Sequence, residues 1–89
     1  MNAIVTVVGK DRVGIIASVC ALLAENNVNI LDISQTILQE YFTMVMLVDA
    51  SACDLPFGDL AALLEQEGKD RDLSIRAQRE DIFNAMHRI

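Results

Sequence analysis

The residues best suited to chemistry form one short segment, Gly9–Ile15, with the sequence GKDRVGI. The segment follows an apolar run and precedes a helical pattern, so it marks the point where a strand ends and a helix begins. The first amides of a helix lack intrahelical partners and lie at the positive end of its dipole, where a carboxylate or phosphate is stabilised. The candidate binding residues are therefore Gly9, Lys10, Asp11, Arg12, Val13, Gly14 and Ile15.

The same segment also has a purely structural interpretation. Gly9 and Gly14 would then only allow a tight turn, and the Asp11 carboxylate would cap the helix by accepting a hydrogen bond from an amide that follows it. Lys10 and Arg12 could steer an anion or could simply be solvated loop charges. In either case we expect replacement of Gly14 to leave the fold largely intact, because helix propensity rises when a glycine near the first turn is replaced.

A second set of polar residues follows in the segment VNILDISQT. Asn29 and Asp32, with Ile30 between them, lie at the start of an expected strand, and we expect them across from the first segment. An amide and a carboxylate at that place could hold the ammonium group of an amino acid. Alternatively, Asn29 closes a turn and Asp32 is a solvated strand residue. Gln35 and Thr36 are weaker candidates, because cross-strand hydrogen bonding explains them equally well.

Other constellations that support catalysis or metal binding are not found in the sequence. Cys20 and Cys53 match neither a zinc-site spacing nor a disulfide framework, and His87 is the single histidine. Met44 and Met46 alternate along a strand, which indicates residues that point into a core or an interface rather than a soft metal site. We therefore expect no catalytic residues, no metal and no cofactor, and two free thiols in a reducing cytoplasm.

Composition narrows the class of partner. The chain has 89 residues, of which 53% are hydrophobic, and this surplus of apolar side chains suggests a surface covered by a second copy. Seven Lys and Arg residues stand against thirteen carboxylates, so we expect neither nucleic-acid binding nor docking on anionic lipid. The chain has no apolar run of membrane-spanning length and no basic region before its first apolar run, so we expect neither a transmembrane segment nor a signal peptide.

Hydrophobic periodicity predicts the elements that position these residues. Strands are expected at 3–8, 28–38, 41–50 and 73–78, and helices at about 12–26 and 56–68, with a short helical tail at 79–89. Apolar side chains recur at helical spacing in the first helix and in the tail. These stripes consist of Ile16, Val19, Cys20 and Leu23, widened by Ile15 and Leu22, and of Ile82, Phe83, Met86 and Ile89.

This order predicts an α+β, ferredoxin-like βαββαβ fold. The first and third strands are apolar on both faces, which places them in the centre of an antiparallel sheet of order 4-1-3-2, with both helices on one face. Residues 1–78 would form this core and residues 79–89 a short C-terminal helix. The helix-free face would expose Ile, Val and Met side chains, so we expect a homodimer that covers this face or extends the sheet.

The two polar segments and the element order together resemble ACT domains. GKDRVGI is similar to the turn of these domains, in which a strand ends in G-x-D-R-x-G-I/L, and VNILDISQT is similar to their second-strand motif with an Asn-Ile-x-Asp core. The resemblance covers residues 1 to about 78 and implies that residues 1–89 form a single ACT domain. It points in particular to stand-alone bacterial and archaeal ACT proteins, which resemble the ACT half of glycine-cleavage regulators.

The resemblance implies a regulatory domain that binds a small effector, most simply an amino acid, acts through a dimer interface and regulates a partner protein. The alternative is a dimerisation or protein-interaction module of the same fold without a ligand. An enzyme is disfavoured. Acylphosphatase has a similar size and strand order, but Asp11 in this turn would repel the phosphate that such an enzyme binds.

Overall fold

Four strands and two helices follow one another in the predicted order βαββαβ. The computed structural model describes residues 1–10 and 13–81. Glu80 and Asp81 have helical conformation, whereas Ile82, Phe83, Met86 and Ile89 of the expected tail helix lie outside the described residues. The elements are β1 (Asn2–Lys10), α1 (Ile15–Glu25), β2 (Asn29–Leu38), β3 (Tyr41–Asp49), α2 (Phe57–Asp70) and β4 (Ser74–Arg79).

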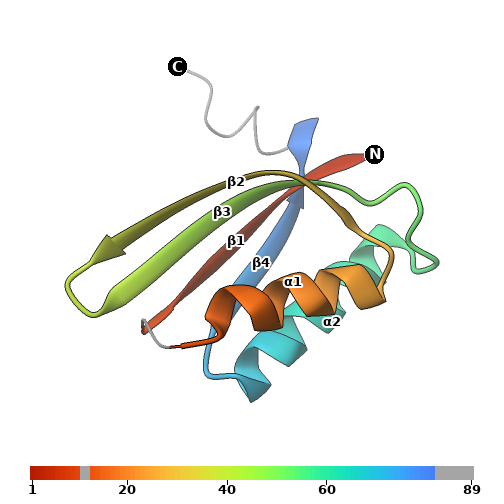
Figure 1. Ribbon diagram of the computed structural model, residues 1–89. Coiled ribbons are helices and arrows are strands. Elements are labelled where there is room, and N and C mark those ends of the chain that lie inside the picture. The colour runs from red at the N-terminus through yellow and green to blue at the C-terminus, as the bar shows by residue number, and fades with distance from the viewer. Residues whose placement is uncertain (11–12, 82–89) are drawn as a thin grey trace.

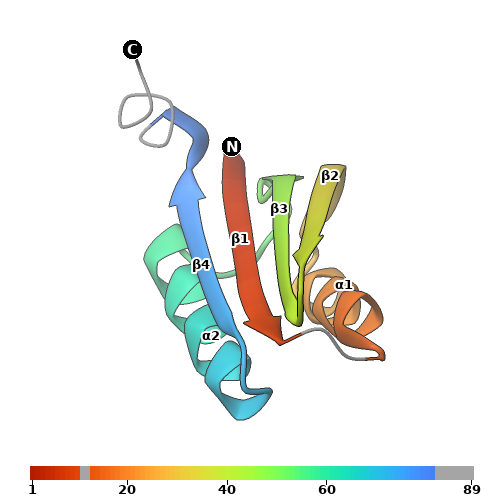
Figure 2. The same cartoon turned by 90° about the vertical axis from the view of Figure 1, so that its left-hand side faces the viewer.

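The strands form one antiparallel sheet of order β2-β3-β1-β4, which confirms the predicted order. β1 pairs with β3 along its whole length, from Asn2 opposite Asp49 to Lys10 opposite Tyr41. Both helices lie on the same face of this sheet, with α1 nearer β2 and α2 nearer β4 (Figures 1 and 2). The sheet therefore has one face covered by helices and one helix-free face.

The core lies between the helices and the alternate residues of the central strands. Met44 and Met46 of β3 are fully buried there, and they pair with Val7 and Val5 of β1 on the same face. Of the two places expected for Met44 and Met46, the core is confirmed, and the expectation of exposed Met side chains on the helix-free face was wrong because the register turns them towards the helices. The strand residues of this core are Ala3, Val5, Val7, Phe42, Met44, Met46, Val48 and Ile75.

The buried face of α1 differs slightly from the predicted stripe. Val19 and Leu23 are buried as expected, but Ile16 is 39% exposed and Cys20 is only half-buried. The core side of the helix consists of Ile15, Val19, Leu22 and Leu23. The helix is thus rotated so that Ile15 and Leu22, which the sequence pattern placed at the edge of the apolar stripe, face the core.

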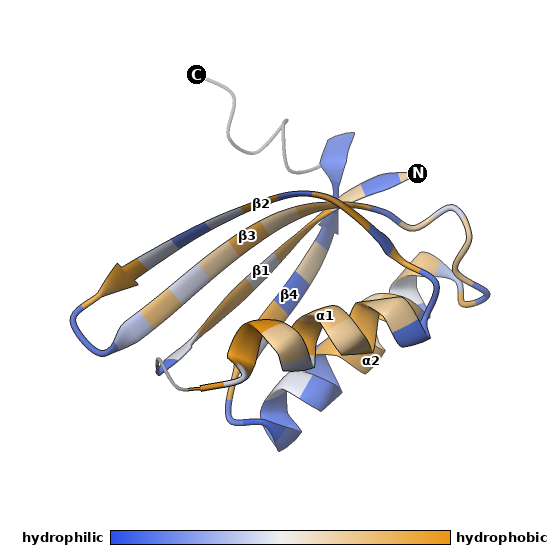
Figure 3. Ribbon diagram, viewed as in Figure 1, coloured by the Kyte–Doolittle hydropathy of each residue, from blue (hydrophilic) through white to orange (hydrophobic). Residues whose placement is uncertain are grey.

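Each helix presents a different kind of surface to solvent. α1 is hydrophobic over almost its whole length, whereas the C-terminal half of α2 is hydrophilic (Figure 3). The two helices are linked where Arg71 Nε, just beyond α2, donates a hydrogen bond of 2.8 Å to Ser18 Oγ of α1. Arg71 also forms an ion pair of 2.5 Å with Glu67. No helix within residues 1–10 and 13–81 is long and apolar enough to cross a bilayer.

The packing of the core predicts that alanine substitutions at two neighbouring leucines of α2 will lower the free energy of unfolding by very different amounts. Leu64 is fully buried, so Leu64→Ala should lower the free energy of unfolding by about 2–5 kcal/mol. Leu63 is only half-buried, and Leu63→Ala should cost clearly less. Urea unfolding at one fixed protein concentration measures both variants, and equal losses would contradict this packing of α2.

Candidate functional site

Gly14 starts α1 in a conformation that favours glycine. Its φ of 89° lies in the left-handed region, and it occupies the N-cap position of the helix. The Asp11 cap that the sequence suggested is replaced by this glycine, which stands directly before the helix; Asp11 itself lies outside the described residues. A glycine has no side chain with which to cap the helix.

The first turn of α1 consequently presents backbone donors that have no side-chain acceptor within residues 1–10 and 13–81. The first helical hydrogen bond runs from the Ser18 amide to the Gly14 carbonyl over 2.9 Å, so the amides of Ile15, Ile16 and Ala17 precede the helical ladder. Among the described residues no side chain caps these amides, and the first turn holds no acidic residue. This is a favourable place for a carboxylate.

These amides border a pocket of about 440 Å³ between the start of α1 and the β2–β3 hairpin. Gln35 and Ile37 of β2 pair with Met44 and Phe42 of β3, so their side chains lie on the helix face of the sheet. Gln35 supplies the one polar side chain among the described lining residues. The lining consists of Gly14, Ile15, Ile16, Ala17, Gln35, Ile37 and Phe42.

Of the predicted turn residues, the structure brings Gly14 and Ile15 to this pocket. Gly9 faces the helix side near β4 instead, where a Cβ would lie 2.5 Å from Leu73 Cδ2, so its small size makes room for that leucine. Lys10 ends β1 on the helix-free face, and Val13 is fully exposed in the turn. Arg12, like Asp11, lies outside the described residues.

Asn29, Ile30 and Asp32 are not across from the turn within one copy of the chain. Asp32 is in register with Leu47 and so with Ile4, whereas Gly9 is in register with Phe42. Five residues of strand separate the two levels by about 17 Å. The expectation was wrong because the eleven residues of α1 carry the chain back by about 16 Å, so that β2 begins at the opposite end of the sheet.

The side chains of this second segment also differ in orientation. Asp32 lies on the helix-free face, where its Oδ1 accepts a hydrogen bond of 2.9 Å from the Ile33 amide beside a bulge in β2. Asn29 is exposed next to Asp49. Ile30 faces the helices and packs against the core.

Asp49 marks the same distant end of the sheet. Hydrogen bonds from the Ser51 hydroxyl, at 2.6 Å, and the Ser51 amide, at 2.9 Å, lower the pKa of its carboxyl. The amino group of Met1 lies 3.5 Å away. These contacts tie the N-terminus to the β3–α2 loop and leave Asp49 with a structural role far from the pocket.

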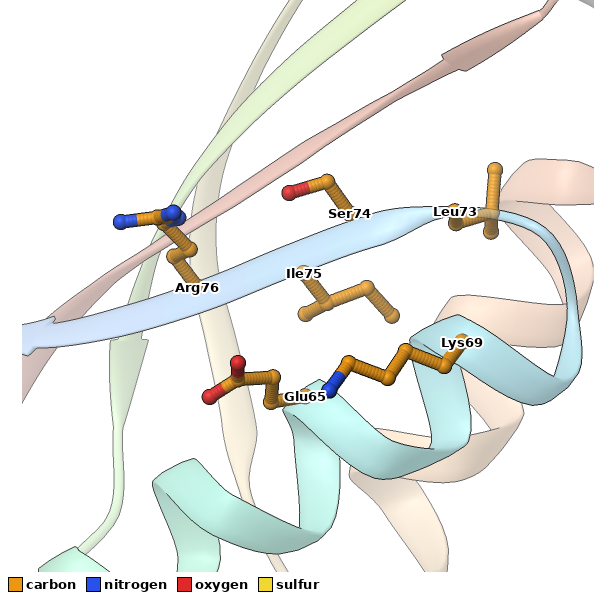
Figure 4. A pocket seen from close by; sticks show the side chains of 6 residues that line it. All are labelled: Glu65, Lys69, Leu73, Ser74, Ile75 and Arg76. Atoms are coloured by element: carbon orange, nitrogen blue, oxygen red, sulfur yellow. The ribbon is translucent and has the colours of Figure 1, made fainter.

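A second hollow of about 210 Å³ lies between α2 and the edge strand β4 (Figure 4). Lys69 projects from α2 towards Glu65, whose carboxylate points away from it, whereas Ser74 and Arg76 lie on the other side of β4 (Figure 4). Its charged side chains are of both signs, and no element of the predicted motifs reaches it. The hollow therefore lacks the convergent donors of the pocket at α1.

Metal-ligand clusters and the state of the cysteines can be assessed for the described residues. Within them, no group of three or more His, Cys, Asp or Glu side chains is placed to hold a metal ion. Cys20 and Cys53 are free and half-buried.

Comparisons with known proteins match this fold and this sequence. A family model described as ACT domain matches residues 2–78. The chain belongs to the ACT domain family. A UPF0237 protein of Clostridium acetobutylicum is 55% identical over the whole of both chains. An ACT domain protein from Streptococcus pneumoniae has a solved structure with a TM-score of 0.83, at 45% identity and with 98% of each chain covered.

A more distant ACT-like structure is that of a putative glycine cleavage system transcriptional repressor. It has a TM-score of 0.73 and 26% identity, and the match covers 86% of this chain but 44% of that one. The resemblance to stand-alone ACT domain proteins, suggested by the GKDRVGI and VNILDISQT segments, is thereby confirmed.

The left-handed conformation of Gly14 reverses the expected effect of replacing it. Gly14→Ala should lower the free energy of unfolding by about 1–2 kcal/mol, because a Cβ is strained at this φ although no atom lies within 4 Å of it. The matched control is Gly58→Ala in the first turn of α2, which has equally open space and no positive φ. It should leave stability unchanged or raise it by up to about 1 kcal/mol. Thermal unfolding of both variants checks the sign, and a neutral Gly14→Ala would contradict the strain.

Proposed function

We propose that this ACT domain is a regulatory module that binds an amino acid and carries out no chemistry of its own. The observation that carries the proposal is the pocket at the start of α1, where uncapped amides meet a mainly apolar chamber. The name of the repressor-like relative supports a regulatory role. In this proposal the regulated process belongs to a partner protein, and the free thiols suit a reducing cytoplasm.

The ligand carboxylate would bind at the first turn of α1. The amides of Ile15, Ile16 and Ala17 would donate hydrogen bonds to it, assisted by the helix dipole. The ammonium group would then face β2, where Gln35 can accept a hydrogen bond through its side-chain oxygen. Lys10 and Arg12 would contribute long-range attraction for the anionic end.

The two edge strands of the sheet differ in length, exposure and charge, and these differences favour β2 over β4 as the strand that contacts a second copy. β2 is ten residues long and almost wholly exposed, with Leu31 at 47%, Ile37 at 56% and Leu38 at 71%. A long edge strand with exposed apolar side chains invites pairing with another chain. β4 is shorter and carries Arg76 and Arg79, which discourage such pairing.

α1 extends the same apolar surface beside β2. Its exposed residues near the edge include Ile16, Ala17, Ala21 and Ala24, and small side chains allow two helices to approach closely. We therefore propose a homodimer formed through β2 and α1, which would join the two sheets edge to edge. This form of dimer extends the sheet and leaves the helix-free face uncovered.

Antiparallel pairing of two β2 strands would also bring the Gly9–Ile15 segment of one copy close to the Asn29–Asp32 segment of the other. It places the Asn29 end of one copy beside the Leu38 end of the other, which is the end that borders the pocket. The Asn29–Asp32 segment of the second copy would then approach the Gly9–Gly14 turn of the first. In this proposal Asn29, Ile30 and Asp32 serve the site across the dimer interface, and ligand binding is coupled to association.

The alternative is a dimerisation module without a ligand. The exposed apolar surface of β2 and α1 supports it, because association alone would explain that surface. Ligand-dependent stabilisation separates the two functions.

A thermal-shift screen over the twenty amino acids tests ligand binding directly. A ligand present at about one hundred times its Kd stabilises the folded state by about 2.7 kcal/mol, so at least one amino acid should raise the Tm by several degrees. If no amino acid changes the Tm, the ligand-free module is the better description.

A pair of serine substitutions tests the dimer surface. Ser34 lies near the middle of β2, so Ser34→Lys should bring two like charges together across the dimer axis and shift the chain towards monomer. Ser74→Lys makes the same change on the opposite edge strand and should leave the dimer intact. Sedimentation at tens of micromolar measures both, and a monomeric wild-type chain or dissociation by Ser74→Lys alone would contradict this interface.

A further inference from the structure

The walls of the pocket at α1 indicate which amino acids it would take, on the basis of the function proposed above. Apart from Gln35, every described side chain that lines it is apolar. Phe42 is 2% exposed and forms the floor with Ile15, while Ile16 and Ile37 stand more open to solvent. We infer that the pocket selects amino acids with an apolar side chain of the size of valine, leucine or isoleucine.

The size of the chamber supports a ligand with a substantial side chain. A volume of about 440 Å³ falls within the range of ordinary ligand pockets, roughly 300–1,000 Å³. Glycine, bound through its carboxylate and ammonium groups, would leave the isoleucine walls in contact with water. An aliphatic side chain would instead remove both its own apolar surface and that of Ile16 and Ile37 from water.

The polarity of the lining excludes ligands with charged side chains. The described lining residues include no charged side chain, and a charge placed among their apolar side chains has no partner. Gln35 is already engaged by the ligand ammonium in the proposed pose, so it offers little to a serine hydroxyl. The hollow between α2 and β4 contrasts with this, because Glu65, Lys69 and Arg76 give it charges of both signs.

Ile37 is the residue that best separates selectivity from folding. It is 56% exposed and lies outside the buried core, so its replacement should leave the fold intact. It nevertheless lines the pocket from the helix face of β2. Val8 of β1 is likewise an exposed aliphatic residue, at 41%, but it lies on the helix-free face, away from the pocket and from β2, which makes it a matched control.

The test is calorimetric titration of the full chain with glycine, serine, aspartate, lysine, valine, leucine and isoleucine. The aliphatic amino acids should bind at least about tenfold more tightly than glycine or serine, since one methylene in a hydrophobic pocket already changes affinity about tenfold or more. Aspartate and lysine should bind most weakly. Isopentylamine, which is leucine without its carboxylate, should lose binding because it cannot use the amides of α1.

The variants complete the experiment. Ile37→Ser should reduce the preference for leucine over glycine about tenfold or more, whereas Val8→Ser should leave this preference unchanged. If glycine or serine binds as tightly as leucine, or if Ile37→Ser does not change the preference, the inferred selectivity is wrong while the proposed function stands. If none of the seven amino acids binds, the proposed amino-acid site itself is wrong.

Discussion

The antiparallel pairing of β1 with β3 carries the core, because it places Val5 and Val7 beside Met46 and Met44 on the face that both helices cover. A slip of one residue would move all of these side chains to the helix-free face, so burial specifies the register strongly. The flanking strands depend on the same pairing, since β2 aligns on β3 and β4 on β1. The position of the pocket follows from it, because Phe42 closes the chamber from β3.

Gly14 connects this sheet to the function that we propose. Its left-handed backbone lets α1 begin immediately after the turn, and because glycine has no side chain, the N-cap residue itself cannot satisfy the first amides of the helix. A serine or aspartate in its place would satisfy one of these amides internally and would compete with a ligand carboxylate. The same residue thus gives up local helix stability and keeps hydrogen-bond donors available for binding.

The sequence was sufficient to predict the elements, the strand order and the family, because alternation in the strands and the GKDRVGI turn are local signals. It misplaced features that depend on distances across the fold. The position of Asn29 and Asp32 depends on how far α1 carries the chain back along the sheet. β3 has two apolar faces, so its sequence alone left open whether Met44 and Met46 face the core or an interface. Ile37 and Phe42, which line the pocket, were not among the candidate site residues, and the strand register is what brings them beside α1.

The two edge strands of the sheet differ in length and charge, and this difference limits how many copies of the chain can assemble. A subunit in which both edge strands could pair with another chain would add further copies at both ends and grow into a fibre. Here Arg76 and Arg79 protect β4, and β2 presents the longer and more exposed edge. In the dimer that we propose, a two-fold contact between β2 strands would use the same surface on both copies and would leave only protected edges outside, so the assembly would close on itself after a single step.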